Sequence, residues 1–382
     1  MRLARDRGSL TFALLMLEGL RAVEISAFVA APFAGATLAA LGAEVIRVEQ
    51  LGGGIDARRW PIHEGRSLYR QGLDQKKRSV AIDLRSQRGR ELVVQLICGG
   101  GDAGGIVVTN LADADWLAYD RLVALRPDLV MVAIRGTSKG RSAVDYTVNA
   151  GIGFPYVTGP PDWEGPVNHV LPAWDVITGA LAATSVLAAE RRRRLTGSGA
   201  LVELALSDVA LGVAGNLGLL SEAALIEEPR GRYGNDLYGS YGRDFRTCDG
   251  RDVMVCALTP RQWRALCDAT GVAEGVAAIE RAEGVDLGDE GERFRYRHKI
   301  SALIEPWVAA RTLDEVAEAF DAAGVLWGPY RTFKEVVADH PEAAALEDPP
   351  QQIGADTEDV LIEGLGLSSE AVAELRAEGV IE

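Results

Sequence analysis

The feature that most constrains the fold is a regular alternation of apolar runs and helical runs between residues 20 and 136. The apolar runs are rich in valine and isoleucine, which favours strands, and the first helical run between them stops at Gly42. Strands that alternate with helices indicate a parallel sheet, because a parallel strand has to be reached through a crossover connection. We therefore predict an α/β domain with strands at residues 20–26, 43–49, 78–84, 103–110 and 128–136.

The length of 382 residues favours two domains, since a single hydrophobic core rarely grows beyond about 250–300 residues. A long helix from about Asp175 to Arg194 precedes an apolar segment, residues 208–226, which carries the chain away from the first domain. The sequence beyond this segment mixes strand patterns with acidic helices, which is typical of an α+β unit. We expect an N-terminal extension at 1–18, a large Rossmann-like domain at 19–222, a small α+β domain at 223–340 and a C-terminal return to the large domain at 341–382.

Charge and cysteine usage limit the partners and the compartment. The net charge of −15 and the pI of about 4.9 argue against nucleic acid as a partner, because an acidic surface repels phosphate backbones. Four scattered cysteines without C-x-x-C spacing argue against a zinc site or a disulfide framework and fit a reducing cytoplasm. Residues 10–17 resemble a short signal peptide, but Glu18 and Arg21 interrupt the apolar run. We expect a cytoplasmic protein without a membrane span, with secretion as the alternative.

The first strand, helix and second strand have the outline of a dinucleotide-binding unit. The turn after the first strand reads SAFVAAPFAGA, however, and lacks the G-x-G-x-x-G fingerprint that lets the backbone approach a pyrophosphate. A nicotinamide enzyme is therefore disfavoured, whereas a nucleotide-bearing ligand held in another way stays open. The basic cluster Lys76, Lys77 and Arg78 before the third strand is the candidate for phosphate contacts, with a solvated turn as the alternative.

The second candidate group is Asp175, in the stretch VNHVLPAWDVITGA. An aspartate before an apolar helix is a favoured N-cap, and capping alone would explain it. Pro172 and Trp174 make the approach stiffer and bulkier than a cap requires, and His169 lies a short loop away. The helix behind is built from glycine and alanine, so a large ligand or a second chain could approach it closely. A carboxylate at this place can also act as a nucleophile.

Several separate blocks of the sequence resemble the class III CoA-transferase (CaiB/BaiF) family. They are GLRAVEISAFVAAPFAGATLAALGAEVIRVE, KKRSVAIDLRSQRGRELVVQLI, LPAWDVITGALAATSVLAAERRRRLTGSGALVELALSD and DTEDVLIEGLGLSSEAVAELRAEGVI. A closer resemblance, carried by GRSLYRQGLDQKKRS, VDYTVNAGIGFPYVTGP, VNHVLPAWDVITG and LYGSYGRDFRTCDGRDVMV, is to members that move CoA between the two carboxyl groups of one dicarboxylic acid. The family implies an interlocked homodimer, whose large domain binds an acyl-CoA thioester as substrate, without a permanently bound cofactor.

Carried over by position, the resemblance implies that Asp175 is the catalytic residue. It places CoA contacts at Val29, Ala30, Lys76, Lys77, Arg78, Asn110 and Asp145. Gly239 and Gly242 are candidates to stabilise an oxyanion, and His169, Tyr146 and Arg243 are candidates to hold the free dicarboxylate, with packing or surface pairing as the alternative role. The sequence departs from the family at Leu111 and Ala118, where an aromatic residue and an arginine are usual, and its return near 341–355 is shorter.

The chemistry implied is covalent catalysis by a carboxylate. Attack of Asp175 on the thioester would release CoA and form a mixed anhydride, and CoA would then return through an aspartyl-CoA thioester. Transfer to the second carboxyl of the same acid is the favoured outcome. The alternatives are transfer to another dicarboxylic acid, and an acyl-CoA racemase, which needs a His/Asp acid–base pair and for which His169 is the local histidine.

Overall fold

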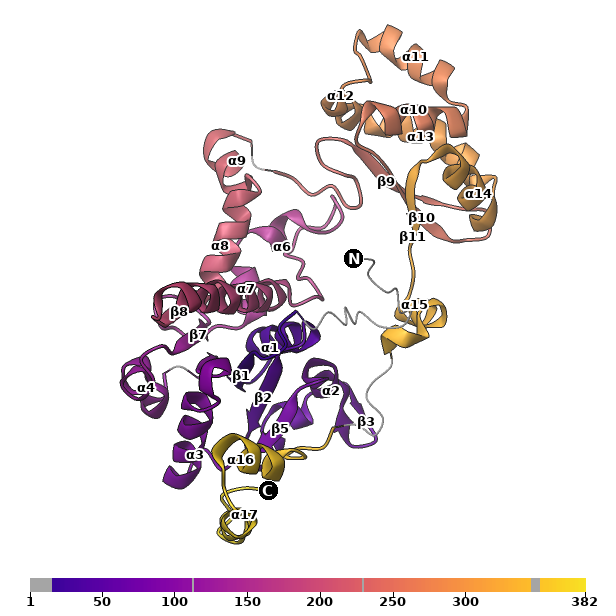
Figure 1. Cartoon of the computed structure of the whole chain (residues 1–382). Coiled ribbons are helices and arrows are strands. Elements are labelled where there is room, and N and C mark those ends of the chain that lie inside the picture. The colour runs from indigo at the N-terminus through magenta and orange to yellow at the C-terminus, as the bar shows by residue number, and fades with distance from the viewer. Residues whose placement is uncertain (1–15, 112, 229, 345–350) are drawn as a thin grey trace. The chain divides into compact units, whose positions relative to one another are not determined.

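The computed structural model describes residues 16–111, 113–228, 230–344 and 351–382. The chain forms two units, which are described separately (Figure 1). The first comprises Met1–Ile152, Asn168–Leu225 and Glu342–Glu382, and the second comprises Gly153–Val167 and Ile226–Pro341. Residues 1–15 of the predicted N-terminal extension and residues 345–350 of the predicted short return lie outside the described residues.

A six-stranded sheet in the order β5-β2-β1-β6-β7-β8 forms the centre of the first unit. All of its neighbouring strands pair in parallel, which confirms the predicted α/β class. The five predicted strands are present, and β8, an edge strand whose residues are mostly half-buried or exposed, was not predicted. The strands are β1 (Arg21–Ile25), β2 (Glu44–Glu49), β5 (Arg78–Ala81), β6 (Ile106–Thr109), β7 (Val130–Arg135) and β8 (Ala200–Ala205).

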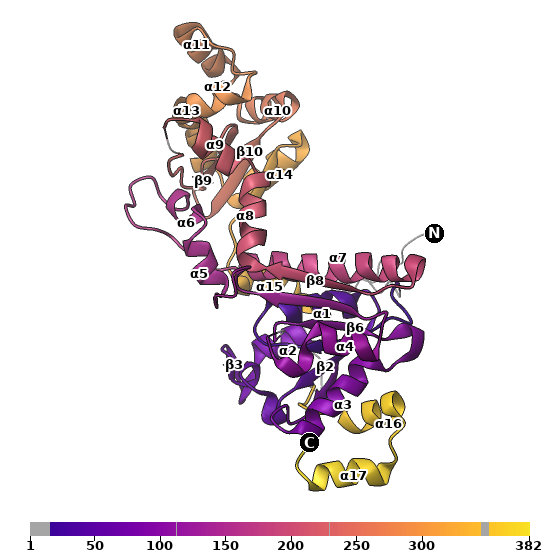
Figure 2. The same cartoon turned by 90° about the vertical axis from the view of Figure 1, so that its left-hand side faces the viewer.

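Helices cover both faces of this sheet. Val23 and Ile25 of β1 belong to a core shared with α3 (Gln87–Cys98) and α4 (Tyr119–Leu125). The intervening Glu24 faces α1 (Ala30–Ala40), because a Cβ added at Gly35 would lie 1.8 Å from its Oε2 atom. Since alternate residues of a strand face opposite sides, α1 and α3 lie on opposite faces. The long helix α7 (Ala173–Thr196) packs on α1 and β7 (Figure 2).

Helices α1 and α7 approach unusually closely. A Cβ at Gly179 of α7 would lie 2.5 Å from the carbonyl oxygen of Ala30 and 3.0 Å from Cβ of Phe33. Any side chain there would displace backbone, so the glycine permits the contact. The close approach brings the second turn of α7 against the first turn of α1, which follows the carboxyl end of β1.

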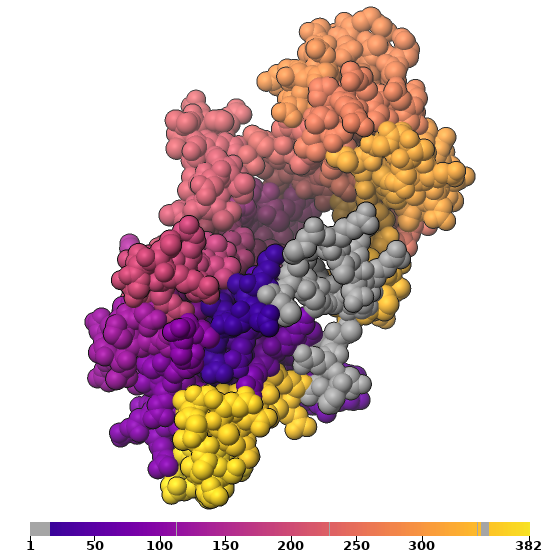
Figure 3. Space-filling model, in the orientation of Figure 1, coloured from indigo at the N-terminus to yellow at the C-terminus, as the bar shows by residue number. Residues whose placement is uncertain are grey.

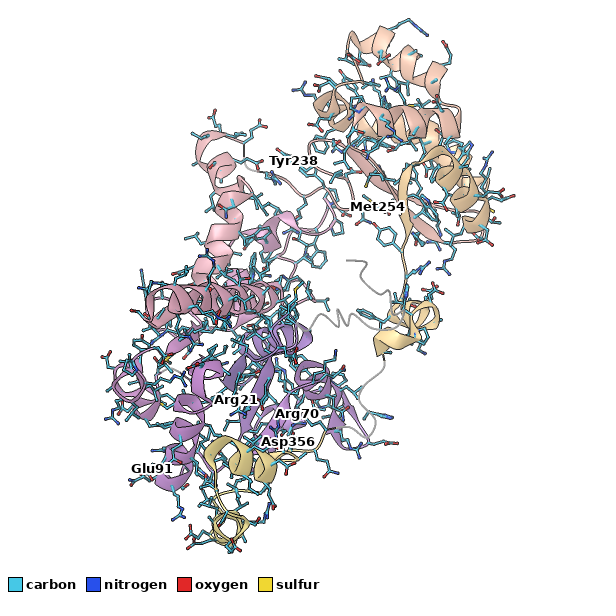
Figure 4. All side chains as sticks on the ribbon, viewed as in Figure 1. Arg21, Arg70, Glu91, Tyr238, Met254 and Asp356 are labelled. Carbon is cyan, nitrogen blue, oxygen red and sulfur yellow. The ribbon has the colours of Figure 1, made fainter. Side chains whose placement is uncertain are left out.

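The C-terminal segment packs against the outer edge of β5. Figure 3 shows this segment as the yellow surface, and Figure 4 labels Asp356 within it. Asp356 donates its backbone N–H to the carbonyl of Ser79 at 2.9 Å, and its carboxylate accepts the N–H of Ser79 at 2.8 Å. The backbone N–H of Asp83 donates to the carbonyl of Val380 at 2.8 Å. Val380 follows the two helices of this segment, α16 (Thr357–Leu365) and α17 (Ser369–Ala377). These bonds satisfy backbone groups that an edge strand would otherwise expose.

The second unit has a three-stranded antiparallel sheet in the order β11-β10-β9. Its core contains Tyr241, Phe245, Val255, Leu266 and Phe320, all buried. The elements are β9 (Tyr241–Arg246), β10 (Asp252–Ala257), α10 (Pro260–Thr270), α11 (Ala273–Glu283), α12 (Glu290–Arg295), α13 (Arg297–Ala309), α14 (Leu313–Ala323), β11 (Leu326–Pro329) and α15 (Phe333–Asp339).

One segment belongs to a different unit from the one that the sequence suggested. Residues 153–167, including α6 (Phe154–Val157), fall within the predicted large domain but belong to the second unit. The reason is a set of non-local bonds: Arg232 donates to the carbonyl of Tyr156 at 2.9 Å and to that of Trp163 at 2.7 Å.

The remaining elements of the first unit connect the layers. They are β3 (Ile62–His63), β4 (Arg66–Ser67), α2 (Leu68–Asp74), α5 (Asp145–Ala150), α8 (Leu206–Asn216), α9 (Leu219–Leu225) and short 3₁₀ turns, one of them at Asp56–Arg58. Among the described residues, no single helix has the length and apolar character to cross a membrane. The pair α8 and α9 is long and apolar enough only when the two helices are taken together, and they are bent by 65° at their junction.

Candidate active site

A cavity of about 740 Å³ lies in the first unit, beyond the carboxyl ends of its central strands. The strand order changes direction at β1: β2 and β5 lie on one side of it, and β6, β7 and β8 on the other. Open parallel sheets bind ligands at such a point, because the loops that leave neighbouring strands diverge there. Side chains from these loops, from α5 and from the start of α7 line the cavity, among them Phe28, Arg59, Asn110, Arg135, Asp145 and Asp175.

Asp175 lies in the first turn of α7 and is not its cap. The helix begins at Ala173, with Pro172 at the capping position, so the prediction of a helix start near Asp175 was two residues late. The cap is supplied from α5: one carboxylate oxygen of Asp145 accepts the N–H of Trp174 at 2.7 Å and that of Asp175 at 3.2 Å. The N-cap interpretation of Asp175 is therefore wrong, because a distant aspartate already satisfies these amide groups.

The carboxylate of Asp175 is left without a hydrogen-bond partner among the described residues, and it faces the cavity. Burial raises the pKa of Asp175 to about 6, the negative charge of Asp145 adds to this rise, and the positive charge of Arg59 opposes it. At neutral pH the group is mostly ionised while being poorly solvated. A carboxylate in this state can act as a nucleophile toward a carbonyl carbon.

His169 and Tyr146 lie at the same end of α7. The Nε2 atom of His169 lies 2.7 Å from the second carboxylate oxygen of Asp145, so both oxygens of Asp145 have partners. The ring of Tyr146 contacts the ring of His169 edge-on, with centroids 6.0 Å apart, and its hydroxyl donates to the carbonyl of Val170 at 3.3 Å. The sequence-predicted group around Asp175 is thus brought together by Asp145.

The loop after β1 forms another wall. Phe28 has a positive φ of 70°, which is rare for a residue with a side chain, and its N–H donates to the carboxylate of Asp56 at 3.1 Å. Asn110 both accepts from the N–H of Ala27 at 3.1 Å and donates to its carbonyl at 2.7 Å. These bonds hold the loop, and they leave the Phe28 ring at the cavity.

The basic cluster that the sequence suggested for phosphate contacts does not line the cavity. The ammonium group of Lys77 is buried and pairs with Glu24 at 2.8 Å and Asp74 at 3.1 Å. The guanidinium of Arg78 pairs with two glutamates of the first unit, and the exposed Lys76 has a φ of 63°. Because β5 lies beside β2, the start of this strand joins a buried network of charges that comprises Glu24, Arg47, Glu49, Asp56, Arg70, Asp74 and Lys77.

Other predicted contacts are divided between the units. Of the residues carried over as CoA contacts, Ala30, Asn110 and Asp145 line the cavity, whereas Val29 is buried at the start of α1. Gly239, Gly242 and Arg243 belong to the second unit. There, Gly239 has a φ of 77°, and the guanidinium of Arg243 lies 3.4 Å from Nδ1 of His298. Their roles toward a substrate stay predictions.

Three cavity arginines were missed by the sequence analysis: Arg59, Arg135 and Arg141. Arg135 ends β7 and pairs with Asp113 at 2.6 Å and Glu203 at 3.3 Å. The sequence carried a signal for Arg135, because a cation near the end of the predicted strand 128–136 lies at the carboxyl end of a parallel sheet. All four cysteines are free thiols, and within the described part of the chain no group of three His, Cys, Asp or Glu side chains is placed to hold a metal ion.

Comparisons with known proteins agree on one family. Residues 17–349 match CoA-transferase family III. The chain is 47% identical to a 2-methylfumaryl-CoA isomerase of Chloroflexus aurantiacus over 399 residues, covering 96% of this chain and 98% of that protein. It is 29% identical to a succinyl-CoA–D-citramalate CoA-transferase of the same organism, covering 85% and 80%. A CaiB/BaiF family protein from Brucella suis has a similar structure, with a TM-score of 0.73 and 26% identity, covering 91% of this chain and 98% of that one.

Proposed function

This chain belongs to CoA-transferase family III, and on that premise we propose that it isomerises 2-methylfumaryl-CoA by moving CoA from the C1 to the C4 carboxyl group. The observation that carries the proposal is Asp175: a half-buried carboxylate without a partner among the described residues, in a cavity at the switch point of the sheet. The identity to a 2-methylfumaryl-CoA isomerase over nearly the whole chain supports the substrate. Coenzyme A enters as part of the substrate.

The first half of the reaction opens the thioester. A carboxylate oxygen of Asp175 attacks the C1 carbonyl carbon, the C–S bond breaks, and CoA leaves as its thiolate. The thiolate then attacks the aspartyl carbonyl of the mixed anhydride, which releases the 2-methylfumarate dianion and leaves an aspartyl-CoA thioester. Each step exchanges an acyl–oxygen bond for an acyl–sulfur bond, or the reverse, so no electron is transferred.

The second half repeats these steps at the other end of the acid. The C4 carboxylate attacks the aspartyl thioester, CoA thiolate leaves, and a new mixed anhydride forms. Attack of the thiolate on the C4 carbonyl gives the product and regenerates the carboxylate of Asp175. The anhydride has to be kept from water, and the partly buried position of Asp175 supports this requirement.

The environment of Asp175 suits a nucleophile of this kind. With a pKa of about 6, roughly nine tenths of the enzyme would carry the ionised form at pH 7. Aspartate has few rotatable bonds, so little freedom is lost when it is held in line with a carbonyl. The bond from Asp145 to the N–H of Asp175 fixes the backbone that carries it.

A direct experiment is to incubate the enzyme with the C1 thioester alone and follow the appearance of the C4 thioester by chromatography. Asp175→Asn and Asp175→Ala should abolish the conversion, while Asp102→Asn, at an exposed position of the same unit, should not change it. Quenching during turnover and mass spectrometry should find an acyl or CoA adduct on Asp175. Full activity of the Asp175 variants would refute the mechanism.

The second candidate is CoA transfer between two different acids, favoured by the similarity to a succinyl-CoA–D-citramalate CoA-transferase. Labelled free 2-methylfumarate supplied with unlabelled thioester distinguishes the two, because only intermolecular transfer incorporates the label heavily. A racemase is less well supported, because Nε2 of His169 is engaged by Asp145. Homodimer formation follows from the resemblance and is part of the proposal.

A further inference from the structure

Arg59 lies in the same cavity as Asp175 and contacts two aromatic rings. Its guanidinium carbon is 5.1 Å from the centroid of the Phe28 ring and 4.6 Å from that of the Tyr69 ring. The short turn at Asp56–Arg58 precedes it, and the N–H of Arg59 donates to the carbonyl of Asp56 at 3.3 Å. Since Asp56 also holds the N–H of Phe28, the arginine and one of its rings are fixed by the same residue.

Arg59 differs from the other cations of this interior in having no carboxylate partner among the described residues. The buried cations Arg47, Arg70 and Lys77 each pair with at least two carboxylates. In the cavity, Arg135 pairs with two carboxylates as well. Other half-buried or buried arginines without a carboxylate partner, such as Arg90, Arg232 and Arg293, donate to backbone carbonyls instead. Among the described residues, the half-buried guanidinium of Arg59 has neither kind of acceptor.

The aromatic contacts leave the guanidinium able to bind an anion. The rings attract the positive charge of Arg59 without accepting a conventional hydrogen bond, and no acceptor for its guanidinium is present among the described residues, so its N–H donors are available for a bidentate carboxylate. The hydroxyl of Tyr69 is also buried without a hydrogen-bond partner among the described residues, and burial raises the pKa of Tyr69 to about 12. This end of the cavity therefore has two hydrogen-bond donor groups, the guanidinium of Arg59 and the hydroxyl of Tyr69. Among the described residues, no carboxylate forms an ion pair with Arg59.

We propose that Arg59 binds the free carboxylate of the substrate, that is, the carboxyl group that is not joined to CoA or to Asp175. The inference rests on the proposed function and deepens it, because it assigns the residue that selects a dicarboxylic acyl group. Arg59 and Asp175 line one cavity, and the charge of Arg59 acts on Asp175, so one small acid can contact both. Arg141 also lines the cavity, but its side chain is exposed.

The same contact accounts for intramolecular transfer. While C1 is bound to Asp175, the guanidinium holds the C4 carboxylate; after CoA has moved to Asp175, it holds the free dianion through either end. For the second half of the reaction, the C4 carboxylate leaves Arg59 to attack the aspartyl thioester, and the C1 carboxylate takes its place on Arg59. A dianion that is held in this way stays in the cavity until its second carboxylate has attacked.

The test compares Arg59→Gln and Arg59→Lys with wild type, with Arg58→Gln as the matched control. Arg58 is the preceding residue, is exposed and does not line the cavity. Three quantities are measured: kcat/KM for conversion of the C1 to the C4 thioester, the label incorporated per turnover from added free 2-methylfumarate, and the affinity for free 2-methylfumarate by calorimetry. Thermal unfolding verifies that each variant is folded.

For Arg59→Gln we expect kcat/KM to fall on the order of 100-fold, because a charge-assisted bidentate contact is lost. Label incorporation per turnover should rise, since the dianion escapes before CoA returns, and the affinity for the free acid should fall about tenfold or more. Arg59→Lys should lie between wild type and Arg59→Gln, because it keeps the charge without the planar fork. Arg58→Gln should match wild type.

Two results would overturn the proposal: a kcat/KM of Arg59→Gln within about threefold of wild type, or a loss of activity with unchanged label incorporation and unchanged affinity for the acid. The second result would show that Arg59 supports only the fold or the CoA site. Failure of the proposed function is a separate outcome, namely a wild-type enzyme that forms no C4 thioester. The calorimetric comparison still decides the role of Arg59 in that case, since equal affinities refute it.

Discussion

Replacement of Asp175 by asparagine is expected to stabilise the first unit at pH 8 and to leave its stability unchanged at pH 4. In the folded protein the pKa of Asp175 is raised to about 6, chiefly by burial and further by Asp145. In the unfolded chain the value is about 3.9. Folding therefore favours the protonated form, so the folded state carries no penalty below pH 4 and loses stability as the pH rises from about 4 to about 6.

The size of the effect follows from the two pKa values. A rise from about 3.9 to about 6 corresponds to about 3 kcal/mol of folding free energy lost above pH 6. Asp175 is only partly buried, so screening by solvent reduces the figure, and we expect about 1–2 kcal/mol. Asparagine has nearly the same shape and no charge, so it should recover this amount, which raises the midpoint of thermal unfolding by about 2–8 °C at pH 8.

The assay is thermal unfolding of wild type and Asp175→Asn between pH 4 and pH 8, followed by intrinsic fluorescence. The protein concentration is kept low, because the pI of about 4.9 lies in this range and a protein without net charge tends to precipitate. Asp102→Asn is the control, because this exposed aspartate lies in the same unit. The difference between wild type and Asp175→Asn should develop between pH 4 and pH 6 and then remain constant. A variant that is no more stable than wild type at pH 8 would contradict the burial of an unpartnered carboxylate.

Three further perturbations test other parts of the site. Asp145→Asn should move the acid limb of the kcat/KM profile below pH 6, because it removes a negative charge that raises the pKa of Asp175; an unchanged limb would show that the two carboxylates do not interact. Gly179→Ala should destabilise the protein by about 1–3 kcal/mol in denaturant unfolding, because its Cβ meets the backbone of α1, whereas Gly212→Ala meets open space and should not. Lys77→Met should cost up to about 3 kcal/mol in the same assay, because it removes one cation from Glu24 and Asp74 and leaves these buried carboxylates only their arginine partners; a wild-type midpoint would argue against the buried network.

Local sequence patterns sufficed where neighbours along the chain make the structure. The alternation of strands and helices predicted the parallel sheet, since periodicity decides which faces are apolar. Serine is a favoured N-cap residue, and the hydroxyl of Ser86, directly before α3, accepts the N–H of Gly89 at 3.0 Å. Asp175 was selected as a candidate nucleophile from a short stretch and a family resemblance.

The sequence by itself determined the type of the elements in the alternation of strands and helices, though not β8, and the presence of a carboxylate at the start of a glycine- and alanine-rich helix. Tertiary structure alone decided what surrounds that carboxylate. The cap comes from Asp145, which lies in α5 and is separated from α7 by a segment of the second unit. Lys77 is buried against Glu24, and Arg59 is held by two rings from different segments. Pairing and burial depend on which distant strands and loops become neighbours, and no local pattern records that choice.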